Sequence, residues 1–165
     1  MRSTIFTSLP VWGLLALSAA AAPEGCYVAG PEDLGPEAVV TALAAELFTD
    51  AGSGETWLGI LAEMAEEGRP AEEGFGGQTL SQTALCEEGP DGLSCTGCEG
   101  GVFRVDRLDA GGLELSTEDF HVGAPEGCGG TTTLARTSGE TTRYSLRRAD
   151  PEACLLPGYR EGDLS

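Results

Sequence analysis

The predicted fold of this chain depends most on residues 83–95, which read TALCEEGPDGLSC. The central Gly-Pro-Asp-Gly is typical of a tight turn, and the residues on both sides favour β-strands. A two-residue turn would place Cys86 directly opposite Cys95, whereas a three-residue loop would shift that pairing by one position. The stretch therefore predicts a β-hairpin, and we favour a disulfide between these two cysteines.

Strand-like sequence continues after this hairpin. Residues 101–107 alternate, with Phe103 and Val105 on one face. A glycine-rich turn follows, and a three-residue loop at 109–111 would pair Val105 with Leu115, which matches two apolar side chains. This region therefore predicts a second antiparallel pair.

The last third of the chain adds further strand signals. Residues 120–122 predict a short strand, and residues 131–136 and 141–147 predict another hairpin. Short strands separated by glycine-rich turns are typical of antiparallel meanders, sandwiches and small barrels. We therefore expect a mainly β fold, a small antiparallel meander, sandwich or barrel stapled by disulfides.

Residues 36–67 allow two interpretations. Apolar residues at helical spacing, together with many Ala, Leu and Glu, favour a helical hairpin. The alternative is a long β-hairpin that turns at residues 51–54. That register matches like side chains across the two strands: Thr49 with Thr56, Phe48 with Trp57, and Leu47 with Leu58. We favour the β-hairpin and keep the helical hairpin, which would make the fold α+β, as the alternative.

The first residues predict an export signal. A positively charged start precedes an apolar run at residues 5–17, and small residues then allow cleavage after Ala20 or Ala22. The run is shorter than a membrane-spanning helix, which needs about 20 residues. We therefore expect residues 1–22 to be a signal peptide and the protein to be periplasmic or secreted, with no membrane span in the mature chain.

The rest of the chain is predicted to form a single small exported domain, residues 23–156. Within it, residues 68–79 are rich in Gly and Glu and predict a flexible loop. Residues 157–165 predict a frayed tail. Lys and Asn are absent from the sequence, which indicates a GC-rich genome and a bacterial source.

The mature sequence contains an even number of cysteines, which predicts a disulfide framework in an exported domain: Cys26, Cys86, Cys95, Cys98, Cys128 and Cys154. If Cys86 pairs with Cys95, the remaining pairs would be Cys98–Cys128 and Cys26–Cys154. The last of these would close the longest loop.

Two alternatives use the C-x-x-C of residues 95–98. One is a redox centre, which normally opens a helix, and the other is half of a zinc site. Glycines surround the motif and strand-like sequence follows it. A second pair of zinc ligands is also lacking in the sequence. The disulfide framework is therefore the favoured interpretation.

The chain carries 27 acidic and 9 basic residues, for a formal net charge of −18. A nucleic-acid binder needs a basic face, so this charge argues against that class of partner. Residues 23–100 contain 16 acidic residues and one arginine, whereas residues 101–165 contain 11 acidic residues and seven arginines. The acidic first part is therefore where we expect a basic partner protein to bind.

The sequence contains no catalytic constellation or cofactor motif. The only histidine is His121, and adjacent carboxylates on a strand point to opposite faces. We therefore expect a non-enzymatic binding or accessory role for an acidic exported domain. The alternatives are an inhibitor or binder of a cationic protein, a thiol–disulfide redox protein, and a divalent-cation binder that uses scattered carboxylates.

Overall fold

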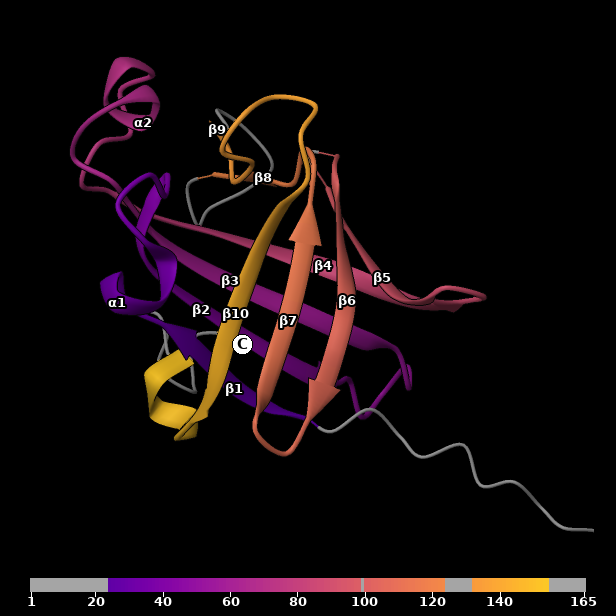
Figure 1. Cartoon of the computed structure of the whole chain (residues 1–165). Helices are drawn as coiled ribbons and strands as arrows, with labels where there is room; N and C mark the ends of the chain where they lie inside the picture. Colours follow the sequence, from indigo (N-terminus) through magenta and orange to yellow (C-terminus); the bar gives the residue numbers. More distant parts are fainter. Residues whose placement is uncertain (1–23, 99, 124–131, 155–165) are drawn as a thin grey trace, which may run out of the picture.

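The computed structural model describes residues 24–98, 100–123 and 132–154. In this part of the chain, antiparallel strands close into a barrel in the order β1-β10-β7-β6-β5-β4-β3-β2 (Figure 1). Their bounds are β1 (Gly25–Ala29), β2 (Val40–Thr49), β3 (Thr56–Met64), β4 (Thr79–Gly89), β5 (Gly92–Gly97), β6 (Val102–Asp109), β7 (Gly112–Thr117) and β10 (Thr142–Ala149). The prediction of a mainly β, disulfide-stapled fold is confirmed, and the architecture is the barrel.

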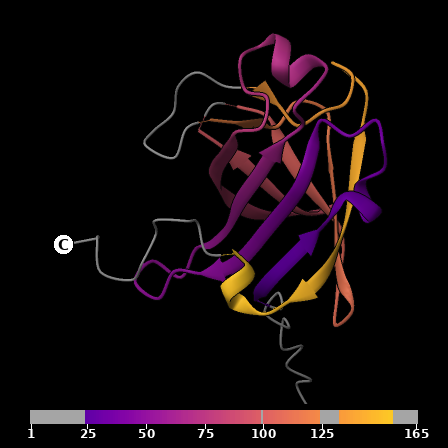
Figure 2. The same ribbon diagram turned by 90° about the vertical axis from the view of Figure 1, so that its left-hand side faces the viewer.

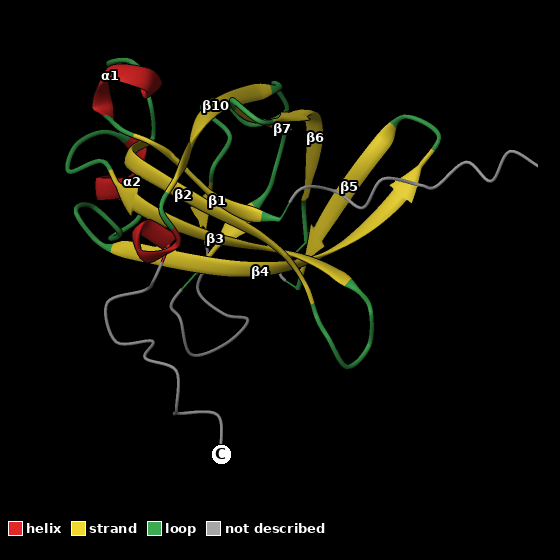
Figure 3. Ribbon diagram, turned by 90° about the horizontal axis from the view of Figure 1, so that it is seen from below, coloured by secondary structure: helices red, strands yellow, loops and turns green. Residues whose placement is uncertain are grey.

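Longer connections cover one end of this barrel. They contain α2 (Arg69–Glu72) and a small sheet of β8 (His121–Val122) and β9 (Thr132–Thr133), at the top of Figure 1. The helix α1 (Pro31–Leu34) follows β1 and contacts β1, β2 and β10. Tight turns join β2 to β3, β4 to β5 and β6 to β7. The β4–β5 hairpin extends away from the rest of the barrel (Figure 3).

The segment of residues 36–67 contains the long hairpin of β2 and β3, so the helical alternative is wrong. All three predicted pairs are present: Thr49 with Thr56, Phe48 with Trp57, and Leu47 with Leu58. The Asp50 carboxylate supports the turn, because it accepts hydrogen bonds from the backbone amides of Gly52 (3.1 Å) and Ser53 (2.7 Å). These bonds, the Ser53 amide first, lower the pKa of Asp50. Burial of one face of each strand outweighs the helical propensity of the segment.

The β4–β5 hairpin has the two-residue turn. Gly89 pairs with Gly92, and Cys86 lies directly opposite Cys95. The Cα atoms of these two cysteines are 3.9 Å apart. The turn signal in the sequence therefore set the register that the favoured disulfide requires.

The β6–β7 hairpin reaches the predicted pairing by a different route. Val105 pairs with Leu115, but Asp109 pairs with Gly112, so the turn has two residues and the predicted three-residue loop is wrong. A bulge between Val105 and Arg107 adds the extra residue, Asp106. With the two-residue turn and no bulge, Leu115 would lie opposite Asp106. Because the bulge leaves Asp106 unpaired, Leu115 instead pairs with Val105, and the two apolar side chains match.

The predicted hairpin of residues 131–136 and 141–147 is wrong. The described part of its first arm, β9, pairs with β8, whereas β10 pairs with β7 on one side and β1 on the other. The inward-facing Tyr144 and Leu146 of β10 gain burial inside the barrel, which a two-stranded ribbon would not provide. Residues 68–79, predicted as a loop, contain α2, and Thr79 begins β4.

The barrel interior is packed with apolar side chains. The largest fully buried ones are Tyr27, Leu43, Leu47, Leu58, Met64, Phe103, Leu113, Leu115, Phe120, Val122, Leu134 and Tyr144. The Phe103 ring lies against Phe120, with centroids 4.3 Å apart, and edge-on to Tyr144 at 6.2 Å. Phe120 belongs to the connection after β7, so the covered end contributes directly to the core.

Several predictions fall partly or wholly outside the described residues. These are the signal peptide at residues 1–22, the tail at residues 157–165, and Cys128. In the described part of the chain, no helix has the length and apolar character that crossing a membrane requires.

Candidate functional site

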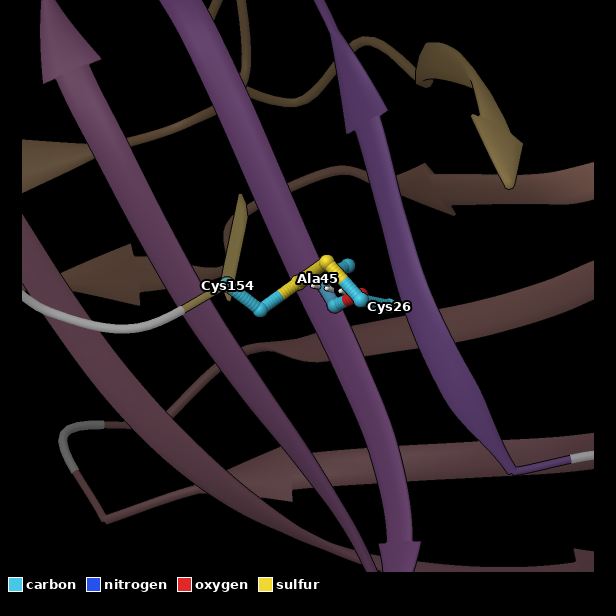
Figure 4. Close-up of a disulfide and its surroundings, with 3 residues drawn as sticks. All are labelled: Cys26, Ala45 and Cys154. Carbon is cyan, nitrogen blue, oxygen red and sulfur yellow. Dashed lines mark hydrogen bonds between the residues drawn. A yellow bond between two sulfur atoms is a disulfide. The ribbon is translucent and has the colours of Figure 1, made fainter. Parts of the chain in front are cut away.

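Two disulfides staple the barrel at separate places. Cys86 pairs with Cys95 across β4 and β5, and Cys26 of β1 pairs with Cys154 of η1 (Pro151–Cys154). Both are pairs that the sequence analysis favours. The Cys26–Cys154 bond lies on the outside of the barrel beside Ala45 (Figure 4) and holds η1 against β1 and β2. Disulfides indicate an oxidising, extracytoplasmic environment.

The C-x-x-C cysteines are not bonded to each other. Cys95 is fully buried and pairs with Cys86. Cys98 is also disulfide-bonded, and its predicted partner, Cys128, lies outside the described residues. Reactive redox cysteines need an accessible thiolate. Cys98, in contrast to Cys95, is exposed. Because Cys95 is bonded to Cys86, the two cysteines of the motif do not form a disulfide with each other.

The described residues contain no group of three or more His, Cys, Asp and Glu side chains that could hold a metal ion. His121, the histidine considered above, lies in β8 opposite Thr133 and is partly buried. The carboxylates of the barrel are instead spread along its surface.

Two sides of the barrel differ in whether their carboxylates pair with arginines. The side formed by β6, β7 and β10 carries arginines that have acidic partners: Arg107 contacts Glu114 at 2.9 Å, and Arg147 contacts Glu32 at 3.3 Å and Asp33 at 3.5 Å. On the side formed by β2, β3 and β4, a set of carboxylates has no ion pair with any described residue: Glu46, Glu55, Glu63, Glu87 and Glu88. These five carboxylates are therefore not neutralised by an arginine of the described residues.

A shallow depression lies over β6, β7 and β10, with a volume of about 350 Å³. The bulge directs Asp106 to its wall, where the carboxylate accepts a hydrogen bond from the Ser116 hydroxyl (3.0 Å) and faces Arg143 at 3.9 Å. Its charged lining is mixed: Arg104, Asp106, Glu118, Asp119 and Arg143. The two signs largely cancel, so this depression does not select a ligand of either charge.

Part of the outer face of β2, β3 and β4 is apolar. Trp57 lies between Phe48 on one neighbouring strand and Leu85 on the other. All three side chains are partly exposed. The core side of the same strands carries the buried neighbours Leu47, Leu58, Ala84 and Cys86. Further along the same face, Ala44 lies opposite Leu61. We call these five residues, Ala44, Phe48, Trp57, Leu61 and Leu85, the outer apolar face.

The like-with-like register of the sequence predicts the pair of Phe48 and Trp57 but indicates no role for it. Strand alternation was the available signal, since it places both on the side opposite Leu47 and Leu58. The position of Leu85 beside Trp57 depends on the pairing of β3 with β4, which no turn signal predicts across residues 65–78.

Comparison of the chain with protein-family models, with curated proteins and with solved structures found no match.

Proposed function

We propose that this protein is an exported, non-enzymatic binding domain and that its partner is a cationic protein. The observation that carries the proposal is the set of carboxylates on β2, β3, β4 and the β2–β3 turn that lack ion pairs with described residues. Exposed charges of one sign raise the rate at which an oppositely charged protein associates. The disulfides and the closed barrel supply a rigid scaffold for such a surface.

The test compares two triple variants that remove the same charge. Glu46→Gln/Glu63→Gln/Glu87→Gln changes the uncompensated carboxylates. Glu32→Gln/Asp33→Asn/Glu114→Gln changes carboxylates that already pair with arginines. Proteins captured by each variant and by the unmodified chain, from the extracytoplasmic fraction of the producing cell, are identified at low and at high salt.

We expect the unmodified chain to capture a protein of high isoelectric point that high salt releases, because salt screens surface charges. The first triple variant should lose most of this capture and the second should retain it. A set of captured proteins that is indifferent to salt, or equal loss in both variants, would contradict the proposal.

A further inference from the structure

We infer that the outer apolar face is the centre of the binding surface and that the partner presents apolar side chains next to arginines or lysines. The inference rests on the proposed function and names the residues and the partner chemistry. Trp57 of β3 is directly opposite Phe48 on β2 and directly opposite Leu85 on β4. Three large apolar side chains thus occupy neighbouring outward positions on three adjacent strands.

This arrangement departs from the pattern of the opposite side of the barrel. Outward positions of β7 and β10 there are polar or charged, as with Ser116 on β7 and with Arg143 and Ser145 on β10. Antiparallel sheets normally place polar residues on the solvated face. Large apolar residues that gather on an outer face mark an interaction site more often than they fill a structural need.

The backbone also shapes this face for contact. Gly59 lies between the outward positions of Trp57 and Leu61 on β3. A Cβ atom at Gly59 would be 4.0 Å from the Phe48 ring, so the ring lies close to the strand over the glycine. The outer apolar face then continues to a depression of about 250 Å³ that Val28, Ala44, Leu61 and Ala153 help to line. In Figure 2, the side formed by β1, β2 and β3 faces the viewer, with η1 across its lower part.

The charges around the outer apolar face define the partner. Glu46 precedes Phe48 by two positions, Glu87 follows Leu85 by two, and Glu63 follows Leu61 by two, so each shares the outward direction of its neighbour. None of these carboxylates has an ion pair with a described residue. An apolar centre with a charged rim is the usual anatomy of a protein interface. The rim here is acidic, which calls for a basic rim on the partner.

The experiment uses the full chain carrying Trp12→Phe, which leaves Trp57 as the only tryptophan. The probes are two synthetic peptides with the same number of arginines. In one peptide arginine alternates with leucine, and in the other it alternates with serine. Binding is followed by the emission of Trp57 at low and at high salt.

We expect the arginine–leucine peptide to bind at least about tenfold more tightly, since burial of an apolar hot spot adds to charge attraction. It should also shift the Trp57 emission to shorter wavelength. Phe48→Ser and Leu85→Ser should each lower its affinity about fivefold and leave the arginine–serine peptide unaffected. Phe75→Ser, which changes a partly exposed aromatic residue of the α2–β4 connection, serves as the control and should change neither affinity.

The outcomes separate this inference from the proposed function. If both peptides bind equally, with salt dependence and no change in Trp57 emission, charge alone attracts the partner and the inference is wrong. If neither peptide binds, or if binding is indifferent to salt, the proposed function itself fails. The two peptides are compared on a chain whose outer apolar face is unmodified. This comparison therefore tests the inference even if Phe48→Ser is unstable.

Discussion

At the scale of single residues, Tyr144 is the most informative side chain of the core. It is buried between the strands and the covered end, and its hydroxyl donates a hydrogen bond to the carbonyl oxygen of Leu134. This bond joins β10 to the connection that precedes it. Burial raises the pKa of Tyr144, an effect that the positive charges of Arg136 and Arg69 only partly offset.

We predict that Tyr144→Phe lowers the free energy of unfolding by about 1–2 kcal/mol at pH 7, because a buried carbonyl loses its donor. The cost should depend on pH. In the unfolded chain the hydroxyl ionises near pH 10, whereas in the folded protein it keeps its proton to higher pH. The contribution of this residue is therefore fully present below pH 10 and declines as the pH rises further.

Urea unfolding of both proteins between pH 7 and pH 11 measures this effect. The difference in unfolding free energy between them should be constant up to about pH 9.5 and should shrink above it, since ionisation of tyrosine in the unfolded state begins near that pH. A difference that does not change with pH would show that Tyr144 ionises alike in both states.

At the scale of elements, the bulge in β6 decides the register of the β6–β7 hairpin. The turn aligns Asp109 with Gly112 and Arg107 with Glu114, while Val105 pairs with Leu115. Asp106 is the residue left over. Without it, Val105 and Arg107 would be consecutive and would still face inward and outward in turn.

We therefore predict that deletion of Asp106 keeps the barrel and costs about 1–2 kcal/mol, mainly the hydrogen bond from Ser116. Deletion of Arg104, two positions earlier, is the matched control. It should abolish stable folding, because Phe103 would turn outward or lose its register with β5. Circular dichroism and urea unfolding distinguish the two variants, and equal damage would mean that the bulge itself is needed to curve the strand.

The short helix α2 is attached to the small sheet by Arg69 and by Glu73, whose carboxylate accepts a hydrogen bond from the Thr132 hydroxyl. The Arg69 guanidinium donates to the carbonyl oxygens of Thr133 and Ala135, both at 2.7 Å, and to the Thr132 hydroxyl at 3.1 Å. It also pairs with Glu73 at 3.4 Å. Hydrogen bonds from a charged donor to buried carbonyl groups are among the stronger ones.

We predict that Arg69→Met loosens the covered end and leaves the barrel intact. The Leu134 amide, which donates to the Phe120 carbonyl at 2.8 Å, should exchange its hydrogen about 30-fold faster, whereas amides of β2 and β3 should not change. Arg104→Met is the control, since the side chain of the exposed Arg104 has no hydrogen bond or ion pair with a described residue. If amide exchange became faster throughout the barrel, Arg69 would stabilise the whole fold and not only the covered end.

At the scale of the whole molecule, the two described disulfides close loops of very different length. Cys26–Cys154 spans 128 residues and ties the first strand of the barrel to the segment after the last. Cys86–Cys95 spans 9 residues within a hairpin that the turn already aligns. Loop-closure entropy grows with the length of the closed loop.

We predict that Cys26→Ser/Cys154→Ser lowers the free energy of unfolding by about 5 kcal/mol and Cys86→Ser/Cys95→Ser by about 2.5 kcal/mol, from the loop lengths. Guanidinium unfolding of each double variant, with the other bridges oxidised, measures both values. A larger loss from the short loop would mean that packing of the buried Cys86–Cys95 pair outweighs chain entropy.

The sequence by itself determined the local hairpins of this protein. The pairs around Thr49 and Thr56, the opposition of Cys86 and Cys95, and the pairing of Val105 with Leu115 were all readable. Each depends on a short turn and on side chains close to it, and such contacts close small loops at low entropic cost.

The tertiary structure alone decided how the hairpins join. Placement of β10 between β7 and β1, and not beside β9, depends on burial summed over a closed barrel. The pairing of β3 with β4, across a connection without a turn signal, brings Leu85 beside Trp57. Strands far apart in sequence have many possible partners, and no local pattern ranks them. The sequence therefore indicated the outward pair of Phe48 and Trp57, but not the position of Leu85 beside them.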